Sequence, residues 1–468
     1  GATIAVTGAA YDLASPTFAS TVVFGNVRRG ATSTLAVGNP VAVNGDAAFQ
    51  DSLDLVATAS NASLSLAGAS VNVVAGSSAN VVVTAAATGS LAGSLSLGLT
   101  SNANGVTGLA NATLSTGNVA VTGASYDYAT ATLGATALTF GDVRVGGTRS
   151  TTLANTILAG GNASFQDSLD IARSTDVAAL GLAAPSKLLA GQSGNVVLTA
   201  ATAGSLAGTV TLGLTSNANG VADLTNLALA GQTVAVTGAA YDLAKPSYAA
   251  SNALGNLRVG VTTKTLAVAN TTITDAAYQD KLAVVATGAT GLTLTNPADI
   301  AAGASGNVTL GAAVAGSLTG NLSLAFTSKA LTGTTLTDVT LAGGSIALTG
   351  AAYDYARATV GSSLALGNVR VGTLANLGVT NTVTTSAAYQ DSLDVTATTA
   401  VGTLSLADPA NILAGKTGNV VLTAATAGSL AGDVALALTS NANGVTGLTT
   451  TALTGATIAV TGAAYDLA

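Results

Sequence analysis

One short segment recurs along the chain at domain-sized intervals, and this constrains the fold more than any other feature. The signature TGAxYDxA places a tyrosine at Tyr11, Tyr126, Tyr241, Tyr353 and Tyr465, with spacings of 115, 115, 112 and 112 residues. A period of this length indicates tandem domains, because the repeats of a solenoid are only about 20–45 residues long. The chain is therefore expected to fold as four consecutive copies of one domain.

Three further markers keep the same frame. The first, FGNVRRG and its variants, places an arginine at Arg28, Arg144, Arg258 and Arg370. The second is an aromatic-Gln-Asp step, whose aspartates are Asp51, Asp167, Asp280 and Asp391. The third is GSLxG near Leu91, Leu206, Leu318 and Leu430, followed in three repeats by LTSNANG. This frame predicts the closing strand of a preceding repeat at 1–14 and four repeats at 15–126, 127–241, 242–353 and 354–468.

Each repeat carries the pattern of β-strands. Segments such as Val196–Ala200, Thr209–Thr215 and Thr233–Thr237 alternate apolar and small polar residues with a period of two. They are separated by GQSGN and SNANG, in which Gly and Asn supply the positive φ angles that turns require. About seven such runs per repeat predict an all-β protein of four tandem immunoglobulin-like β-sandwich domains in an elongated array.

The composition of the 468 residues excludes most catalytic chemistry. There is no His, Cys, Met or Trp, all 21 acidic residues are aspartate, Lys and Arg number 14, and charged residues make up 7%. Without thiol or imidazole groups there is no Cys nucleophile, no Ser–His pair and no zinc, copper or iron–sulfur site. A net charge of −7 argues against a nucleic-acid partner. We expect no enzyme activity and no cofactor. Hard-cation binding by Asp and carbonyl oxygens, with Ca²⁺ as the candidate, carbohydrate contact and a mechanical role remain compatible with this composition.

The order of the markers resembles a known family. FGNVRRG, a strand ending in VGNPV (Val37–Val41), VANTT (Val268–Thr272) or VTNTV (Val379–Val383), and a closing TVxVTGxxY are similar to the choice-of-anchor D repeats of bacterial surface proteins. Those repeats are related to the ASH/Hydin-type immunoglobulin-like domains. LANTI (Leu153–Ile157) fits the pattern less well. The resemblance implies a β-sandwich in an exported surface protein and carries over no catalytic residue.

The first and last fourteen residues are identical, GATIAVTGAAYDLA at 1–14 and at 455–468. In the repeat frame this segment is a closing strand, so the sequence spans one super-repeat plus an overlap. Either a longer chain continues the pattern covalently, or the first strand completes the open sheet of a neighbouring subunit. Covalent continuation is favoured, because the donated strand would compete with an identical resident strand. No run of about 20 apolar residues and no signal peptide is evident, so the chain is expected to begin inside a larger precursor.

Five aspartates follow the recurring tyrosines at the predicted domain joints, and they are the candidate calcium ligands: Asp12, Asp127, Asp242, Asp354 and Asp466. The alternative is an Asx-type turn or a salt bridge to the recurring arginine. Since each joint offers a single local carboxylate, the turn or salt bridge is the favoured interpretation.

Paired aspartates occur in the QDSLD motif, as Asp51 with Asp54, Asp167 with Asp170, and Asp391 with Asp394, whereas the third repeat has QDKLA. A carboxylate dyad could serve a hydrolase. Residues three apart on a strand face opposite sides, however, so we expect a hydrogen-bonded strand edge that pairs with arginine. The recurring aromatics are expected to pack at a sandwich edge or domain joint.

These features favour a passive building block. We expect a structural component of an extracellular filament, fibre or surface layer at the cell surface, which self-associates or continues in a longer chain. Its surface of Thr, Ser, Asn, Ala and Gly lacks the mixed charge that keeps soluble proteins apart. The alternative is the stalk of a bacterial adhesin that presents a distal binding domain.

Overall fold

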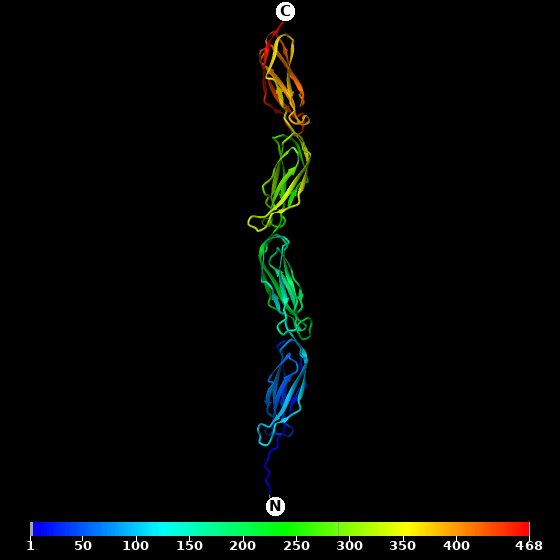
Figure 1. Ribbon diagram of the computed structural model, residues 1–468, viewed down its shortest axis with the longest axis vertical. Coiled ribbons are helices and arrows are strands. Elements are labelled where there is room, and N and C mark those ends of the chain that lie inside the picture. The colour runs from blue at the N-terminus through cyan, green and yellow to red at the C-terminus, as the bar shows by residue number, and fades with distance from the viewer. Residues whose placement is uncertain (1–2, 289, 468) are drawn as a thin grey trace. The chain divides into compact units, whose positions relative to one another are not determined.

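The computed structural model describes residues 3–288 and 290–467, so Gly1, Ala2, Ala289 and Ala468 of the predicted repeats lie outside the described residues. The chain divides into two compact units, Gly1–Ala240 (unit 1) and Tyr241–Ala468 (unit 2). Each unit contains two β-sandwiches, which Figure 1 shows as separate pairs of sheets along the colour gradient. We number the sandwiches 1 to 4 in chain order.

The strands of the four sandwiches follow one plan. Sandwich 1 contains β1 (Thr17–Phe18), β2 (Thr21–Arg28), β3 (Thr32–Asn39), the 3₁₀ turn η1 (Ala47–Phe49), β4 (Ser52–Ala59), β5 (Leu64–Ala67), β6 (Ser70–Val73), β7 (Ser77–Ala85), β8 (Gly89–Ser90), β9 (Gly93–Asn102), β10 (Ala112–Thr113) and β11 (Gly117–Tyr126). Sandwich 2 contains β12 (Ala131–Leu133), β13 (Ala137–Arg144), β14 (Thr148–Asn155), η2 (Ala163–Phe165), β15 (Ser168–Thr175), β16 (Leu180–Ala183), β17 (Lys187–Leu188), β18 (Ser193–Ala200), β19 (Gly204–Ser205), β20 (Gly208–Asn217), β21 (Leu227–Ala228) and β22 (Gln232–Tyr241).

The two sandwiches of unit 2 repeat this order. Sandwich 3 contains β23 (Pro246–Tyr248), β24 (Ser251–Arg258), β25 (Thr263–Asn270), η3 (Ala276–Tyr278), β26 (Lys281–Gly288), β27 (Leu292–Thr295), β28 (Ser305–Ala312), β29 (Gly316–Ser317), β30 (Gly320–Lys329), β31 (Val339–Thr340) and β32 (Gly344–Tyr353). Sandwich 4 contains β33 (Ala358–Val360), β34 (Ser363–Arg370), β35 (Leu374–Asn381), η4 (Ala387–Tyr389), β36 (Ser392–Thr399), β37 (Leu404–Ala407), β38 (Thr417–Ala424), β39 (Gly428–Ser429), β40 (Gly432–Asn441), β41 (Thr451–Ala452) and β42 (Ala456–Tyr465).

The strand order is that of an immunoglobulin-like sandwich. In sandwich 1 one sheet has the order β1-β3-β7-β5 and the facing sheet the order β2-β11-β9-β4-β6. Neighbouring strands are antiparallel, with one exception. β2 and β11, the first and last long strands of the sandwich in sequence, pair in parallel. These sheets correspond to the ABED and GFC sheets of an immunoglobulin domain. The same orders recur in sandwiches 2, 3 and 4, with β17 as the counterpart of β6 in sandwich 2. In the described part of sandwiches 3 and 4 this edge strand is reduced to the isolated bridges Leu282↔Ile300 and Leu393↔Ile412.

Each sandwich encloses its own apolar core. Leu95, Leu97 and Leu99 on β9 are at most 2% exposed, and they alternate with the small residues Ser96, Gly98 and Thr100 on the outer face. Four separate clusters of buried Val, Leu and Ala side chains result, one for each sandwich. Period-two alternation therefore suffices to build the core even though aromatic residues contribute little to it.

A pair of glycines lets two strands of sandwich 1 approach each other closely. Gly123 on β11 lies opposite a bulge in β2, and a Cβ atom there would stand 2.5 Å from the carbonyl oxygen of Gly25. Both residues have positive φ angles, 133° and 67°. The glycine of FGN and the glycine of TGA are thus steric requirements of the parallel strand pair.

The all-β, immunoglobulin-like prediction is confirmed. The structure adds short strands such as β1, β8 and β10, which are only two residues long and have no periodicity that a sequence could reveal. The turn assignment of SNANG is confirmed as well, since Asn104 and Gly105 have φ angles of 56° and 75°. The exact boundaries of the predicted repeats stay predictions.

Candidate functional site

A buried polar network lies where the chain enters each sandwich. In sandwich 1 Asn39, at the end of β3, donates from Nδ2 to the carbonyl oxygens of Asp51 (3.0 Å) and Val73 (3.1 Å). Gln50 Nε2 donates to Asn39 Oδ1 at 2.9 Å, and Ser101 Oγ donates to Asp51 Oδ2 at 2.7 Å. Asn39 and Ser101 are fully buried, so each of these bonds forms in a region of low dielectric.

The network is repeated in all four sandwiches. The equivalent residues are Asn155, Gln166, Asp167 and Ser216; Asn270, Gln279, Asp280 and Ser328; and Asn381, Gln390, Asp391 and Ser440. The serine–aspartate bond measures 2.7 Å in every case. Its members come from three of the sequence markers, namely the VxN strand end, the aromatic-Gln-Asp step and the TSN segment. The markers recur in frame because they are parts of one structure.

The YD segment that precedes each sandwich is held by this network. Before sandwich 1, Asp12 N donates to Phe49 O (2.9 Å), Asp12 O accepts from Asp51 N (2.9 Å), and Ala14 N donates to Ser101 Oγ (2.8 Å). The rings of Tyr11 and Phe49 are in edge contact, with centroids 5.5 Å apart. The equivalent ring pairs are Tyr126–Phe165, Tyr241–Tyr278 and Tyr353–Tyr389, with centroids 5.3–5.6 Å apart. The structure thus places the recurring aromatics at the entry to each sandwich.

Inside unit 1 an arginine joins sandwich 1 to sandwich 2. Arg28, the last residue of β2, donates from Nη1 to Asp167 Oδ1 at 2.9 Å, and its Nη2 lies 2.9 Å from Asp167 Oδ2. The same guanidinium donates to the carbonyl oxygens of Asp127 (3.3 Å) and Thr225 (3.2 Å) and lies over the Tyr128 ring at 4.1 Å. We call this contact between sandwiches the first joint.

Inside unit 2 the second joint repeats this geometry between sandwiches 3 and 4. Arg258 binds Asp391 through two bonds, Nη1–Oδ1 at 2.8 Å and Nη2–Oδ2 at 2.7 Å, and lies 4.6 Å over the Tyr355 ring. The Arg258 side chain is 6% exposed, against 18% for Arg28. Two-point arginine–carboxylate pairing fixes orientation as well as distance, so each joint resists rotation.

A loop from the following sandwich adds a second contact to each joint. Asn26 Nδ2 donates to Ala222 O at 3.2 Å in unit 1, and Asn256 Nδ2 donates to Thr446 O at 3.0 Å in unit 2. Both acceptors lie in the segment that follows the SNANG turn. The asparagine of the FGN marker therefore belongs to the joint together with the arginine two residues later.

Asp127 illustrates the electrostatics of the first joint. Its Oδ1 lies 3.0 Å from Arg29 Nε, and its Oδ2 is buried without a hydrogen-bond partner. Burial raises the pKa of the Asp127 carboxyl above its ordinary value, and the nearby charges of Arg29 and Arg28 oppose that rise. The Asp127 carboxylate therefore pairs with Arg29, which does not recur in the other repeats, whereas the recurring Arg28 donates only to the carbonyl oxygen of Asp127.

The other candidate calcium ligands lie at equivalent places. Asp12, Asp242 and Asp354 form backbone bridges to Gln50, Gln279 and Gln390. Asp466 follows β42, where its carbonyl oxygen accepts from Arg370 Nη1 at 2.9 Å. Across residues 3–288 and 290–467 no group of three or more acidic side chains is arranged to hold a metal ion. A calcium site at the joints stays a prediction.

The two aspartates of QDSLD do different things. Asp51 belongs to the buried network, whereas Asp54 on β4 accepts from Asn72 Nδ2 (2.6 Å) and Asn102 Nδ2 (2.7 Å). Asp394 accepts from Asn441 in the same way, and Asp170 from Asn217. The second aspartate thus anchors the SNANG turn.

Two members of the network are not among the residues predicted from the sequence. The asparagine of the VxN strand end reads there only as a family marker, and the serine of TSN only as part of a turn. Ser328 is a usable signal, because it persists in the third repeat although Lys329 and Leu331 replace the two asparagines of SNANG there. A serine that is kept where the asparagines of the turn are replaced is expected to have a role outside the turn.

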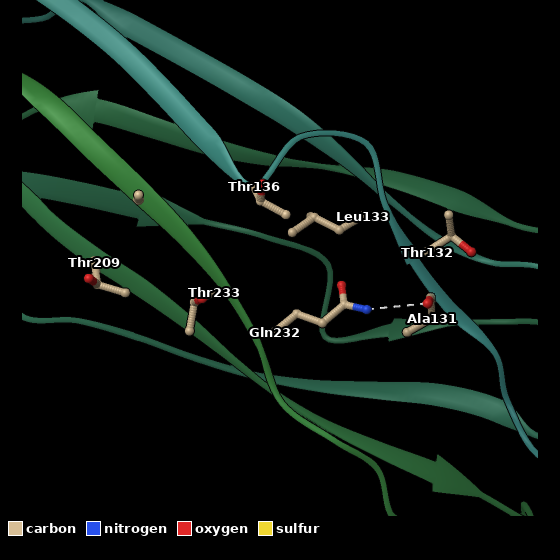
Figure 2. A pocket seen from close by; sticks show the side chains of 8 residues that line it. Ala131, Thr132, Leu133, Thr136, Thr209, Gln232 and Thr233 are labelled. Carbon is tan, nitrogen blue, oxygen red and sulfur yellow. Dashed lines mark hydrogen bonds between the residues drawn. The ribbon is translucent and has the colours of Figure 1, made fainter.

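A surface hollow of about 510 Å³ opens beside β12 and β22 (Figure 2). Small neutral side chains line it, including Thr132, Thr136, Thr209 and Thr233, and Gln232 Nε2 donates to Ala131 O at 3.3 Å. With no charged group in its lining, it offers little to orient a charged ligand. The joints remain the candidate functional site. In the described part of the chain no helix is long and apolar enough to cross a membrane.

Known proteins resemble this chain in fold alone. No family model matches it, and no curated protein does. Among solved structures, the titin I-band fragment I67–I69 is 9% identical, with 73% of this chain and 99% of that chain covered and a TM-score of 0.29. Domains 4–9 of the surface layer protein SbsC are 13% identical, with 95% and 65% covered and a TM-score of 0.19. A protein of unknown function from Porphyromonas gingivalis W83 is 12% identical over 48% and 99%, with a TM-score of 0.19.

Proposed function

We propose that this chain is a structural component of an extracellular filament, fibre or surface layer at the cell surface. The observation that carries the proposal is that its recurring polar residues hold domains and joints together. Asn39, Gln50, Asp51 and Ser101 bind one another inside sandwich 1, and Arg28 binds the next copy of the network in sandwich 2. A relationship to choice-of-anchor D repeats, and the absence of enzyme activity, belong to this proposal.

The strand arrangement suits a load-bearing role. β2 and β11 pair in parallel from Thr21↔Ala120 to Arg28↔Tyr126. The chain therefore enters sandwich 1 near the start of β2, at one end of this pair, and leaves it after β11, at the other end. Tension along the chain draws such strands past each other, so the ladder hydrogen bonds between them are loaded together rather than one after another. The Arg28–Asp167 pair at the end of the same strand would transmit this load to sandwich 2.

Electron microscopy of native material tests the proposal. Uniform or bundled filaments, or a regular layer, labelled by antibodies against this chain would support it. Single projections with a distinct tip would support the alternative, the stalk of an adhesin. Intracellular labelling would overturn both.

A further inference from the structure

Sandwich 2 differs from the other three sandwiches in the connection between its first two strands. β12 ends at Leu133 and β13 begins at Ala137, so the three residues 134–136 join them. The equivalent connections 19–20, 249–250 and 361–362 have two residues each. The added residue lies where the chain passes from one sheet to the other, since β12 and β13 belong to different sheets.

In two of the other sandwiches an aromatic ring and a glycine fill this place together. In sandwich 1 the Phe18 ring lies on Gly117, where a Cβ atom would stand 2.5 Å from the ring carbon Cζ. In sandwich 3 the Tyr248 ring lies on Gly344 in the same way. The ring and the glycine depend on each other, because any larger residue on the closing strand would collide with the ring.

Sandwich 2 has replaced both members of this pair. By strand register, Leu133 occupies the position of the ring and Gln232 the position of the glycine. In sandwich 4 the same two positions hold Val360 and Ala456. A polar residue therefore occurs at this pair of positions in sandwich 2 and in none of its counterparts, apart from the phenol of the sandwich 3 ring.

The hollow of about 510 Å³ opens at this place (Figure 2). Leu133 and Thr136 line it from β12 and the connection, and Gln232, Thr233 and Ala235 line it from β22. Its volume lies within the range of ligand pockets, about 300–1,000 Å³. The added residue, the two replaced side chains and the hollow thus coincide in one sandwich, which a purely passive repeat does not require.

The amide group of Gln232 has hydrogen bonds to offer. Its Nε2 donates to Ala131 O at 3.3 Å, beyond the usual range of about 2.7–3.2 Å. Within the part of the chain that the structure describes, its Oε1 is buried without a hydrogen-bond partner, and Figure 2 shows this oxygen on the side of Leu133. A donor on a ligand would supply the bond that this oxygen lacks. Because a single long bond holds the amide, the side chain can turn toward such a ligand at low cost.

The lining selects for a neutral ligand that carries hydroxyl groups. It contains no charged side chain, so an ion would lose its hydration there without gaining a partner. The hydroxyls of Thr136, Thr209 and Thr233 and the amide of Gln232 can donate and accept hydrogen bonds, and Leu133 supplies an apolar contact. A sugar ring combines hydroxyl groups with C–H surface in the same way, whereas an apolar ligand would leave the amide and the hydroxyls without partners.

We infer that this hollow binds a neutral sugar and that Gln232 is its polar anchor. The inference goes beyond the proposed structural role, to which it adds a carbohydrate partner. It does not depend on that role, because the joints that carry it lie outside the hollow.

Saturation-transfer NMR on the full chain tests the inference. The probes are glucose, galactose, mannose and N-acetylglucosamine, each offered as the monosaccharide and as a disaccharide, and at least one should receive saturation from the protein. Q232A introduces the residue type found at position 456 of sandwich 4, so it should fold. It should weaken binding about tenfold, the equivalent of one or two hydrogen bonds. Q192A changes an exposed glutamine of the same sandwich outside the hollow and should leave binding unchanged.

A double variant closes the site with the protein's own solution. L133F/Q232G rebuilds in sandwich 2 the ring and glycine that Phe18 and Gly117 form in sandwich 1. The variant should fold, because the same sheet geometry already accommodates this pair, and it should weaken sugar binding at least as much as Q232A does.

The two sources of a sugar are distinguished by the same measurement. Tighter binding of a disaccharide than of its monosaccharide would identify a glycan chain as the ligand, and equal binding would identify the free sugar. Three results would overturn the inference: no transfer to any of the sugars, transfer that Q232A and L133F/Q232G leave unchanged, or transfer to the neutral peptide trialanine in place of the sugars. Each would leave the proposed function intact, since electron microscopy tests it separately.

Discussion

Arg258 and Asp391 form a two-point ion pair across 133 residues of sequence, with their side chains 6% and 1% exposed. The pair connects the last residue of β24 with the buried network of the next sandwich. Ser440 Oγ also binds the same carboxylate, at 2.7 Å from Asp391 Oδ2. Folding of sandwich 4 and attachment of sandwich 3 therefore depend on one side chain.

Removing the arginine should destabilise the second joint more than the first. R258A leaves Asp391 buried without its cation, and we expect a loss of about 3 kcal/mol in the stability of sandwich 4. Arg28 is more exposed, so R28A should cost sandwich 2 roughly half as much. Hydrogen exchange measured by mass spectrometry on the intact chain reports the loss of stability in each of the two units separately. R173A, a surface substitution, serves as the control, and equal effects at both joints would contradict the burial argument.

The aromatic ring under the arginine should make a smaller contribution. Y355L introduces the residue found naturally at positions 13 and 243, and it removes the contact of Arg258 with the Tyr355 ring. We expect a loss of roughly 0.5–2 kcal/mol, the range of cation–π interactions from exposed to desolvated sites. Protection of amides in β36 and β40 against hydrogen exchange reports the change. A variant as stable as the parent would show that the stacking is incidental.

The buried asparagine should be among the most sensitive positions in the chain. Asn270 makes four hydrogen bonds, to Lys245 N, Asp280 O, Ile300 O and Gln279 Nε2. N270A leaves these groups without a partner in a buried site, and we expect a loss of about 3 kcal/mol or more. Chemical denaturation followed by tyrosine fluorescence measures it. N321A, at an exposed position, should change stability by less than about 0.5 kcal/mol.

The sequence predicts the sandwiches well because their cores depend on local alternation. Val210, Leu212 and Leu214 are buried and alternate with small residues, and the predicted segment Thr209–Thr215 lies within β20. The repeat also identifies the residues of the joint, since Tyr126, Arg28 and Asp167 each recur in frame.

What the sequence does not show is which repeat each residue contacts. Arg28 binds Asp167 of the following sandwich, although its own repeat contains an equivalent aspartate, Asp51. In-frame recurrence cannot distinguish a contact within one repeat from a contact to the next, because both have the same period. Arg28 reaches the next sandwich because β2 ends at the joint. The direction of β2 is known only once the fold is known.

Gly123 provides a steric test of the parallel strand pair. G123A would place a methyl group 2.5 Å from Gly25 O at a φ of 133°, and both strain and overpacking then oppose folding. We expect a loss of about 3 kcal/mol in sandwich 1. Gly105 has a φ of 75° with open space around it, so G105A should cost only about 1 kcal/mol. Thermal unfolding of the two variants compares them directly, and equal costs would mean that the close approach does not constrain the sheet.

The buried carboxyl of Asp127 should leave a signature in the pH dependence of stability. Burial raises its pKa in the folded state above the ordinary value of 3.8. The folded protein then binds this proton more tightly than the unfolded chain does, so the contribution of Asp127 is fully present below pH 3.8 and is lost as the pH rises through the higher folded value. D127N removes this titration. The stability of D127N relative to the parent should therefore increase between about pH 3.8 and the folded pKa and stay constant above it. Urea denaturation at a series of pH values measures the difference, and the other carboxylates cancel because both proteins share them. A relative stability that falls with rising pH would mean that Arg29, rather than burial, controls this group.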